Sequence, residues 1–354
     1  MSHPQSTFPA FRPPWWLAGG HRQTLWTTVA RPVPEVDYER EVLELPDGDF
    51  LDLAWAWAAG GAGEAATHEA TANGTPKPTP PPARARHLAI LSHGLEGSVD
   101  RRYMRGMAQR FNAAGWDVLA WNMRGCGERP NRLPRPYHSG ATEDLHAVVT
   151  HGLARGGYDS AVLVGFSLGA NLTLLYLGRE REFVPGAVAG AVAFSTPVDL
   201  LAAARNIERP ANWLYELRFL RSLHRRARAL AARHPTALDP AVLRHATTIF
   251  AYDDHITAPL AGFEGALDYY TRSSSLPRLA AIDRPTLMLS AADDPFLPAA
   301  CYPRAVVDPL PHVTLEIPDR GGHVGFLARG DGKGRARGYW SERRAVAFAR
   351  EIVG

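Results

Sequence analysis

The segment GFSLG occupies residues 165–169 and decides the fold that we expect for this chain. An apolar run, residues 161–164, leads into it, and a helix-forming run, residues 170–177, follows it. The order strand, G-x-S-x-G, helix is typical of a nucleophile elbow, in which two glycines let strand and helix approach closely around a strained serine. The pattern therefore predicts that the Ser167 hydroxyl stands free at the carboxyl end of a strand, next to the positive end of a helix.

The composition is that of an ordinary globular protein. Of the 354 residues, 45% are hydrophobic and 21% are charged, and the formal net charge is only +3. No basic stripe interleaved with aromatic residues accompanies this charge, so we predict no nucleic-acid partner. The two cysteines, Cys126 and Cys301, are too few for a disulfide framework. We see neither a signal peptide nor a run of about 18 apolar residues, which predicts a cytoplasmic protein without membrane insertion.

Short apolar segments alternate with helix-forming segments along most of the chain. A hairpin is expected first, from residues 41–45 and 51–57. Strands are then expected at residues 88–91, 117–121, 161–164, 187–194, 285–290 and 313–317, and helices at residues 102–114, 141–153, 170–177 and 341–352. This alternation predicts the α/β class, with a mostly parallel central sheet flanked by helices, in a single domain that spans residues 1–354.

Two segments interrupt the alternation. Residues 58–86 consist largely of Ala, Gly, Thr and Pro and are predicted to form a flexible surface insertion. Residues from about 198 to 280 contain helical segments and no clear strand. We predict that they form a helical cap over the carboxyl ends of the strands, which is the edge where open α/β sheets bind ligands.

Two loops late in the chain offer partners for the serine. A serine hydroxyl becomes a good nucleophile when a base removes its proton and a carboxylate supports that base. The loops AADDPFLP, at residues 291–298, and GGHVG, at residues 321–325, each follow a predicted strand. We therefore expect Asp294 and His323 to join Ser167. Asp293 is the alternative acid. Asp294 is favoured because it lies four residues before Pro298, a spacing that resembles the acid loop of many α/β-hydrolases, and Asp293 suits a cap for the following turn.

The negatively charged oxygen that forms in acyl transfer needs two preorganised donors. One follows from the elbow itself, the backbone N–H of Leu168. The other should come from the loop SHGLEG, at residues 92–97, after an early strand, and the N–H of Leu95 is our candidate. We expect His93 to order this loop rather than to take part in the chemistry.

Further motifs lie along the whole chain: GGHRQTL (19–25), HGLEGS (93–98), NMRGCG (122–127), PNR (130–132), YHSG (137–140), EDL (143–145) and DDPF (293–296). With GFSLGAN at 165–171, they resemble the YheT-like subfamily of α/β-hydrolases, the AB-hydrolase-4 group, which is related to ABHD1/ABHD3-type lipases. The resemblance runs from about residue 8 to the C-terminus, except for 58–86. It implies the α/β-hydrolase fold and a triad of Ser167, Asp294 and His323. Ala170 departs from the glycine usual in the family.

The resemblance implies a carboxylic ester hydrolase (EC 3.1.1.-) that forms an acyl-enzyme and needs no cofactor. The expected substrates are short- or medium-chain acyl esters or monoacylglycerol-like lipids, and the apolar cap residues Trp213, Phe219 and Phe263 favour an acyl chain. Two alternatives stay open. One is an alcohol O-acyltransferase with the same triad, and the other is a non-catalytic protein that binds acyl ligands.

Other polar residues receive structural interpretations. The long loop after residues 117–121 and the helix after the serine contain residues that we expect to order these segments: Arg124, Asn131, Arg132, Tyr137, His138 and Asn171. The histidines at 138, 146 and 151 lack metal-ligand spacing, so we predict no metal site. Six arginines between residues 218 and 233 are interpreted as a solvated helix face, with transient contact to a membrane surface as the alternative.

Overall fold

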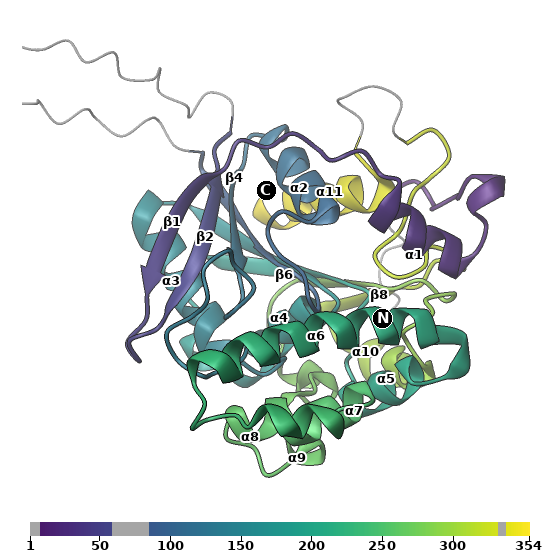
Figure 1. Ribbon diagram of the computed structural model, residues 1–354. Helices are drawn as coiled ribbons and strands as arrows, with labels where there is room; N and C mark the ends of the chain where they lie inside the picture. Colours follow the sequence, from purple (N-terminus) through teal and green to yellow (C-terminus); the bar gives the residue numbers. More distant parts are fainter. Residues whose placement is uncertain (1–7, 59–84, 332–337) are drawn as a thin grey trace, which may run out of the picture.

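The computed structural model describes residues 8–58, 85–331 and 338–354 (Figure 1). Apart from residues 58, 85 and 86, the predicted insertion at 58–86 lies outside this part of the chain. The described residues form an eight-stranded sheet with the spatial order β1-β2-β4-β3-β5-β6-β7-β8. Its strands are β1 (Glu39–Glu44), β2 (Phe50–Ala56), β3 (His87–Ser92), β4 (Asp117–Asn122), β5 (Ser160–Phe166), β6 (Val188–Phe194), β7 (Thr286–Leu289) and β8 (Val313–Glu316).

The sheet is mostly parallel, which confirms the predicted fold class. β2 runs antiparallel to β1 and β4, and every other neighbouring pair is parallel. Within the β3–β5 pair, Ser92 lies opposite Gly165. The loop that leaves β3 and the G-x-S-x-G turn therefore emerge side by side at the carboxyl edge of the sheet.

Helices cover both faces of this sheet, as the apolar strands require. Alternate residues of β3 enter different cores: Leu91 packs with residues of α2 (Arg102–Asn112) and α11 (Trp340–Val353), whereas Ile90 packs with α3 (Thr142–Gly156) and α4 (Leu168–Arg179). Because both faces are buried, the strands read as continuous apolar runs rather than as alternating ones. The short α10 (Arg304–Val307) precedes β8.

The segment between β6 and β7 is helical, and Figure 1 shows its helices gathered on one side of the sheet. They pack around a core of their own, which includes Leu223, Ile256 and Tyr270. The elements are α5 (Leu200–Ile207), α6 (Trp213–Arg233), α7 (Ile249–Tyr252), a π-helix (Asp253–Thr257), α8 (Ala258–Leu260) and α9 (Ala266–Ser273). The 3₁₀ turns of the whole described chain are Trp15–Leu17, Arg181–Phe183, Pro210–Asn212, Pro240–Arg244, Leu276–Ala281 and Ala299–Cys301.

A short helix that the sequence analysis did not predict lies near the N-terminus. It is α1 (Gly20–Val29), within the GGHRQTL motif. Trp16 packs edge-on against Trp26 of this helix at 4.7 Å between ring centroids, whereas Trp15 is fully exposed. The buried side chains of α1 are polar, namely Gln23, Thr24 and Thr27, and this explains its weak apolar pattern. Trp26 adds a partly buried apolar contact to Leu327 and Tyr339.

A buried ion cluster organises the loop after β4. The Arg124 guanidinium donates to both carboxylate oxygens of Asp144, at 2.9 and 2.8 Å, and to Asp49 at 3.1 Å. Asn131 also donates to Asp49, at 2.9 Å. Arg132 forms a bidentate pair with Glu44. These contacts confirm that this group of residues orders the loop.

We expect the substitution Arg124→Met to reduce the free energy of unfolding by about 3–5 kcal/mol, because it leaves Asp49 and Asp144 buried without their cation. Urea unfolding measures this difference. The control is Arg86→Met, whose exposed pair with Asp159 should contribute less than about 1 kcal/mol. Equal losses in the two variants would contradict a special role for the buried cluster.

Candidate active site

Ser167 lies in the tight turn between β5 and α4, as predicted. Its backbone has φ 53° and ψ −117°, a strained conformation for a residue with a side chain. A Cβ atom on Gly165 would lie 2.4 Å from the carbonyl oxygen of Gly169, and one on Gly169 would lie 2.4 Å from that of His93. No larger residue fits at either position without moving backbone, so the glycines permit the contact of strand, helix and neighbouring loop.

Asp294 and His323 meet in the structure although 29 residues separate them. Asp294 follows β7 and His323 follows β8, so parallel pairing brings both loops to the edge that carries Ser167. The Nδ1 atom of His323 lies 2.9 and 3.1 Å from the two carboxylate oxygens of Asp294. The Asp294 side chain is fully buried. A buried carboxylate at this position fixes the ring orientation and leaves Nε2 for other partners.

The neighbouring Asp293 has a different role from the one expected. Its carboxylate accepts a hydrogen bond from the backbone N–H of Gly322 at 2.9 Å, so it holds the loop before His323. The turn after the acidic pair is capped instead by Asp294, which accepts from the N–H of Phe296 at 2.9 Å. Burial raises the pKa of Asp293 above its ordinary value.

Helix α1 holds the histidine loop, a contact that the sequence analysis missed. The backbone N–H of His323 donates to the Thr24 hydroxyl at 2.8 Å. The buried Gln23 amide donates to the carbonyl of Leu327 and accepts from its N–H, at 3.1 and 3.0 Å. From the other side, the N–H of Val324 donates to the Ser195 hydroxyl at 3.0 Å. In the sequence, the GGHRQTL motif was the only indication that α1 contacts the histidine loop, and the motif does not suggest a chemical role.

The loop after β3 packs directly on the serine. A Cβ atom on Gly94 would lie 3.1 Å from the Cβ of Ser167. Leu95 and Leu168 both line the cavity beside Ser167, and neither backbone N–H donates to an acceptor within the described residues. His93 is buried and neutral: it accepts from the N–H of Met123 at 3.1 Å, so its other nitrogen donates to the Gly94 carbonyl at 2.8 Å. His93 thus orders this loop, as expected.

Glu96 connects this loop to the longest helix of the segment between β6 and β7. Its backbone has φ 53°, and its side chain is buried. The carboxylate accepts hydrogen bonds from Tyr137 at 2.9 Å, from Arg226 of α6 at 2.9 Å and from Ser222. The interpretation of the arginine run as a solvated face is therefore wrong for Arg226, because Arg226 pairs with the buried Glu96 carboxylate. The pattern of leucines in the sequence did not reveal this partner.

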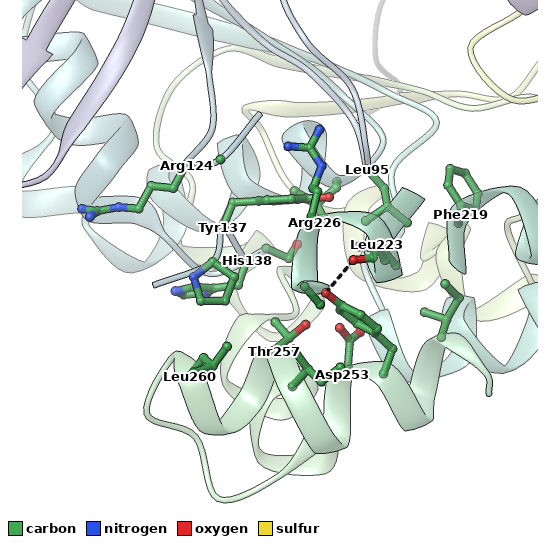
Figure 2. Close-up of a pocket in the computed structure, with 18 of the residues that line it drawn as sticks. Leu95, Arg124, Tyr137, His138, Phe219, Leu223, Arg226, Asp253, Thr257 and Leu260 are labelled. Atoms are coloured by element: carbon green, nitrogen blue, oxygen red, sulfur yellow. Dashed lines mark hydrogen bonds between the residues drawn. The ribbon is translucent and has the colours of Figure 1, made fainter. Parts of the chain in front are cut away.

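An apolar cavity of about 230 Å³ extends from Ser167 into the helical segment (Figure 2). Figure 2 shows Leu95, Phe219 and Leu223 around it. Of the aromatic residues expected to contact an acyl chain, Phe219 lines the cavity, whereas Trp213 is exposed and Phe263 packs against Tyr269 outside the lining. A second pocket, of about 300 Å³, shares Ser167, His323 and Phe219 with the cavity.

Two titratable groups with shifted pKa values also line the cavity. Burial raises the pKa of Asp253 to about 6, although the Tyr270 hydroxyl donates to it at 2.6 Å. Burial lowers the pKa of His138 to about 4. Cys126 is buried as well, and its pKa is raised to about 12, which agrees with a structural role. Within the described residues, no cluster of three or more His, Cys, Asp or Glu residues has the arrangement of a metal site.

Comparison with known proteins identifies the family. Residues 90–329 match the family model of the alpha/beta hydrolase fold. The chain belongs to the α/β-hydrolases. This α/β-hydrolase is 33% identical over 311 residues to the YheT protein of Escherichia coli (strain K12), named as an esterase; the match covers 87% of this chain and 84% of YheT. It is also 28% identical to the human phospholipase ABHD3, over 90% of this chain and 73% of ABHD3.

Solved structures agree on the fold of this α/β-hydrolase. The esterase Pf2001 of Pyrococcus furiosus superposes with a TM-score of 0.52 at 15% identity, covering 98% of this chain and 100% of that one. The sequence identities to YheT and ABHD3 confirm the resemblance to the YheT-like group that the motifs suggested. None of the helices in the described residues has the length and apolar character needed to cross a membrane.

The buried His138 predicts a pH effect on stability. In the unfolded chain this histidine has a pKa near 6.5, whereas in the folded protein its pKa is about 4. The unfolded state therefore binds more protons between these pH values, and the free energy of unfolding falls as the pH falls. From pH 6.5 to pH 5, the loss from one such group is about 2 kcal/mol.

We therefore expect His138→Phe to show a smaller loss of unfolding free energy between pH 7 and pH 5 than the wild type, by about 1–2 kcal/mol. Urea unfolding at the two pH values measures the difference. Two other groups contribute to the pH dependence. Burial also lowers the pKa of His93 to about 4, and the raised pKa of Asp253 acts in the opposite direction. Both groups are present in the wild type and the variant, so their contributions cancel in the comparison. Parallel losses in both proteins would contradict the assignment.

Proposed function

We propose that this carboxylic ester hydrolase acts through Ser167 as the nucleophile, His323 as the general base and Asp294 as the carboxylate that supports the histidine. The observation that carries the proposal is the contact of the buried Asp294 carboxylate with His323 Nδ1, at 2.9 Å, beside a serine held at φ 53°. A nucleophile, a base and an orienting acid on three adjacent loops are the parts that acyl transfer requires.

In the first half of the reaction, Ser167 Oγ attacks the ester carbonyl carbon and its proton passes to His323 Nε2. The carbonyl oxygen becomes an oxyanion, which the N–H groups of Leu95 and Leu168 bind. Both amides lack an acceptor within the described chain, so they are available for it. His323 then returns the proton to the leaving alcohol as the C–O bond breaks, and the acyl group stays on Ser167.

In the second half, water attacks the acyl carbon and its proton passes to His323. The C–Oγ bond then breaks, His323 returns the proton to Ser167 Oγ, and the carboxylic acid leaves. The apolar cavity of about 230 Å³ beside Ser167 suits a short- or medium-chain acyl group. In this proposal the helices between β6 and β7 act as a cap that excludes water from that chain. The names of the relatives, an esterase and a phospholipase, support an ester or lipid substrate.

The test is hydrolysis of a nitrophenyl ester series, from acetate to palmitate, by the wild type and Ser167→Ala. We expect the variant to lose at least about 10⁴-fold in kcat, because the acyl-enzyme cannot form. Ser160→Ala, at the start of the same strand, is the control and should keep its activity. A fluorophosphonate should label Ser167, as read by mass spectrometry. Turnover by Ser167→Ala at the wild-type rate would overturn the proposal.

Arg226 is expected to be a positioning residue for the oxyanion loop. The substitution Arg226→Met leaves the buried Glu96 without its cation, so the backbone that presents Leu95 should relax. We expect kcat to fall about 10- to 100-fold with a small change in KM, less than the loss of an oxyanion donor itself.

The matched control is Arg225→Met on the same helix, since Arg225 is exposed and has no ion pair within the described residues. Steady-state kinetics on one nitrophenyl ester compare the two variants, and urea unfolding shows whether both are folded under assay conditions. An unchanged kcat in a folded Arg226→Met protein would refute the positioning role.

A further inference from the structure

The second pocket beside Ser167 differs in chemistry from the apolar cavity. Arg101, Arg102 and Arg218 line it, together with threonine hydroxyls of α1. Because it shares Ser167 and His323 with the apolar cavity, an ester whose acyl chain fills that cavity directs its alcohol part into this pocket. The residues of the second pocket therefore face the leaving group.

The arginines of this pocket have no carboxylate partner. Within the described residues, none of Arg101, Arg102 and Arg218 has a carboxylate oxygen within 4.0 Å. Arg101 donates to the backbone carbonyl of Glu96 at 2.6 Å, and Arg102 to that of Arg31 at 2.7 Å. Arg218 donates to no acceptor in the described part of the chain, although a guanidinium carries five N–H donors.

Two carboxylates also line the pocket, and each is already neutralised by other arginines. Asp100 pairs with Arg40 at 2.7 Å and with Arg105 at 3.2 Å. The buried carboxylate of Glu96 pairs with Arg226 at 2.9 Å. The charge that remains unpaired at the pocket is therefore positive.

This arrangement brings exposed like charges together at the pocket. Arg101 and Arg102 lie at the first residues of α2, the positive end of the helix, where acidic residues are favoured and basic ones are not. Partial burial, and to a lesser degree the positive charge of Arg101, lowers the pKa of Arg218. Like charges held together beside a nucleophile are relieved when an anion binds between them.

We propose that this pocket is a subsite for an anionic leaving group, in which Arg101 and Arg218 bind a phosphate or carboxylate carried by the alcohol part of the ester. The inference rests on the proposed function, because it uses Ser167 to divide acyl from alcohol. During acylation the Oγ–C bond forms and the ester C–O bond breaks. The alcohol leaves with the proton from His323, and its anionic group stays unchanged on the arginines.

The experiment compares matched esters that differ in charge. For the carboxylate, the pair is the octanoyl ester of a hydroxynitrobenzoate and the same compound with the carboxylate masked as its methyl ester. For the phosphate, the pair is octanoylglycerol phosphate and octanoylglycerol. The readout is the ratio of kcat/KM for the anionic ester to kcat/KM for its neutral counterpart, which a general loss of structure does not change.

We expect this ratio to be at least about tenfold in the wild type for one of the pairs, and to fall at high salt because screening weakens the attraction. Arg218→Gln and Arg101→Gln should each reduce it at least about fivefold, a loss of roughly 1 kcal/mol. The control is Arg221→Gln, since Arg221 is an exposed arginine on the same helix that does not line the pocket. It should keep the wild-type ratio.

A binding measurement separates failure of the subsite from failure of the proposed function. Octyl phosphate titrated calorimetrically into the wild type should bind at least about fivefold more tightly than into Arg218→Gln, whether or not either protein turns over an ester. A wild-type ratio near one for both pairs, or equal losses with anionic and neutral esters in the variants, overturns the subsite. Turnover that survives Ser167→Ala overturns the proposed function instead. The pair with the larger ratio identifies phosphate or carboxylate.

Discussion

The close contact of three backbone segments around Ser167 is the constraint on which the rest of the site depends. At Gly165 and Gly169, strand β5, helix α4 and the loop after β3 approach so closely that a single methyl group would lie 2.4 Å from a carbonyl oxygen. The parallel register of β3 and β5 sets this contact, since Ser92 lies beside Gly165. Ser167 and the loops of Leu95 and Leu168 are therefore one packed unit rather than independent segments.

The sequence predicted the parts of the site that depend on local order. Ser167, Asp294 and His323 each lie in a loop that follows a strand, and parallel strands end at one edge, so their gathering at that edge could be predicted without knowing any distance. The neighbouring Asp293 shows the limit of such reasoning. Spacing favoured Asp294 as the partner of the histidine, but it did not reveal that Asp293 accepts from Gly322, because that bond depends on how two loops cross.

Contacts between distant segments were beyond the sequence. Thr24 and His323 are 299 positions apart, and Glu96 and Arg226 are 130 apart, and both pairs join elements that no periodic pattern connects. In the sequence, Thr24 and Glu96 stood out only as members of the GGHRQTL and HGLEGS motifs, and nothing indicated their partners. The arginine run shows why the simple interpretation fails: Arg221 and Arg225 are exposed as expected, while Arg226, one position further on, points to a buried carboxylate. Helical periodicity identifies a face but not what packs against it.

These distant contacts connect the helical segment between β6 and β7 to the loops around Ser167. Helix α6 touches the loop of Leu95 through the Glu96–Arg226 ion pair, and it touches α1 through the Tyr215 hydroxyl, 3.2 Å from His21. Helix α1 in turn holds the backbone of His323. A displacement of α6 that widened the apolar cavity would have to break its contacts to the Leu95 loop and to α1, or move these segments with it. The Glu96 side chain is 4% exposed and that of Arg226 is 32% exposed, so separating this pair leaves a buried carboxylate without its cation. Substrate entry without movement of α6 keeps these contacts, whereas entry through a movement of α6 breaks them.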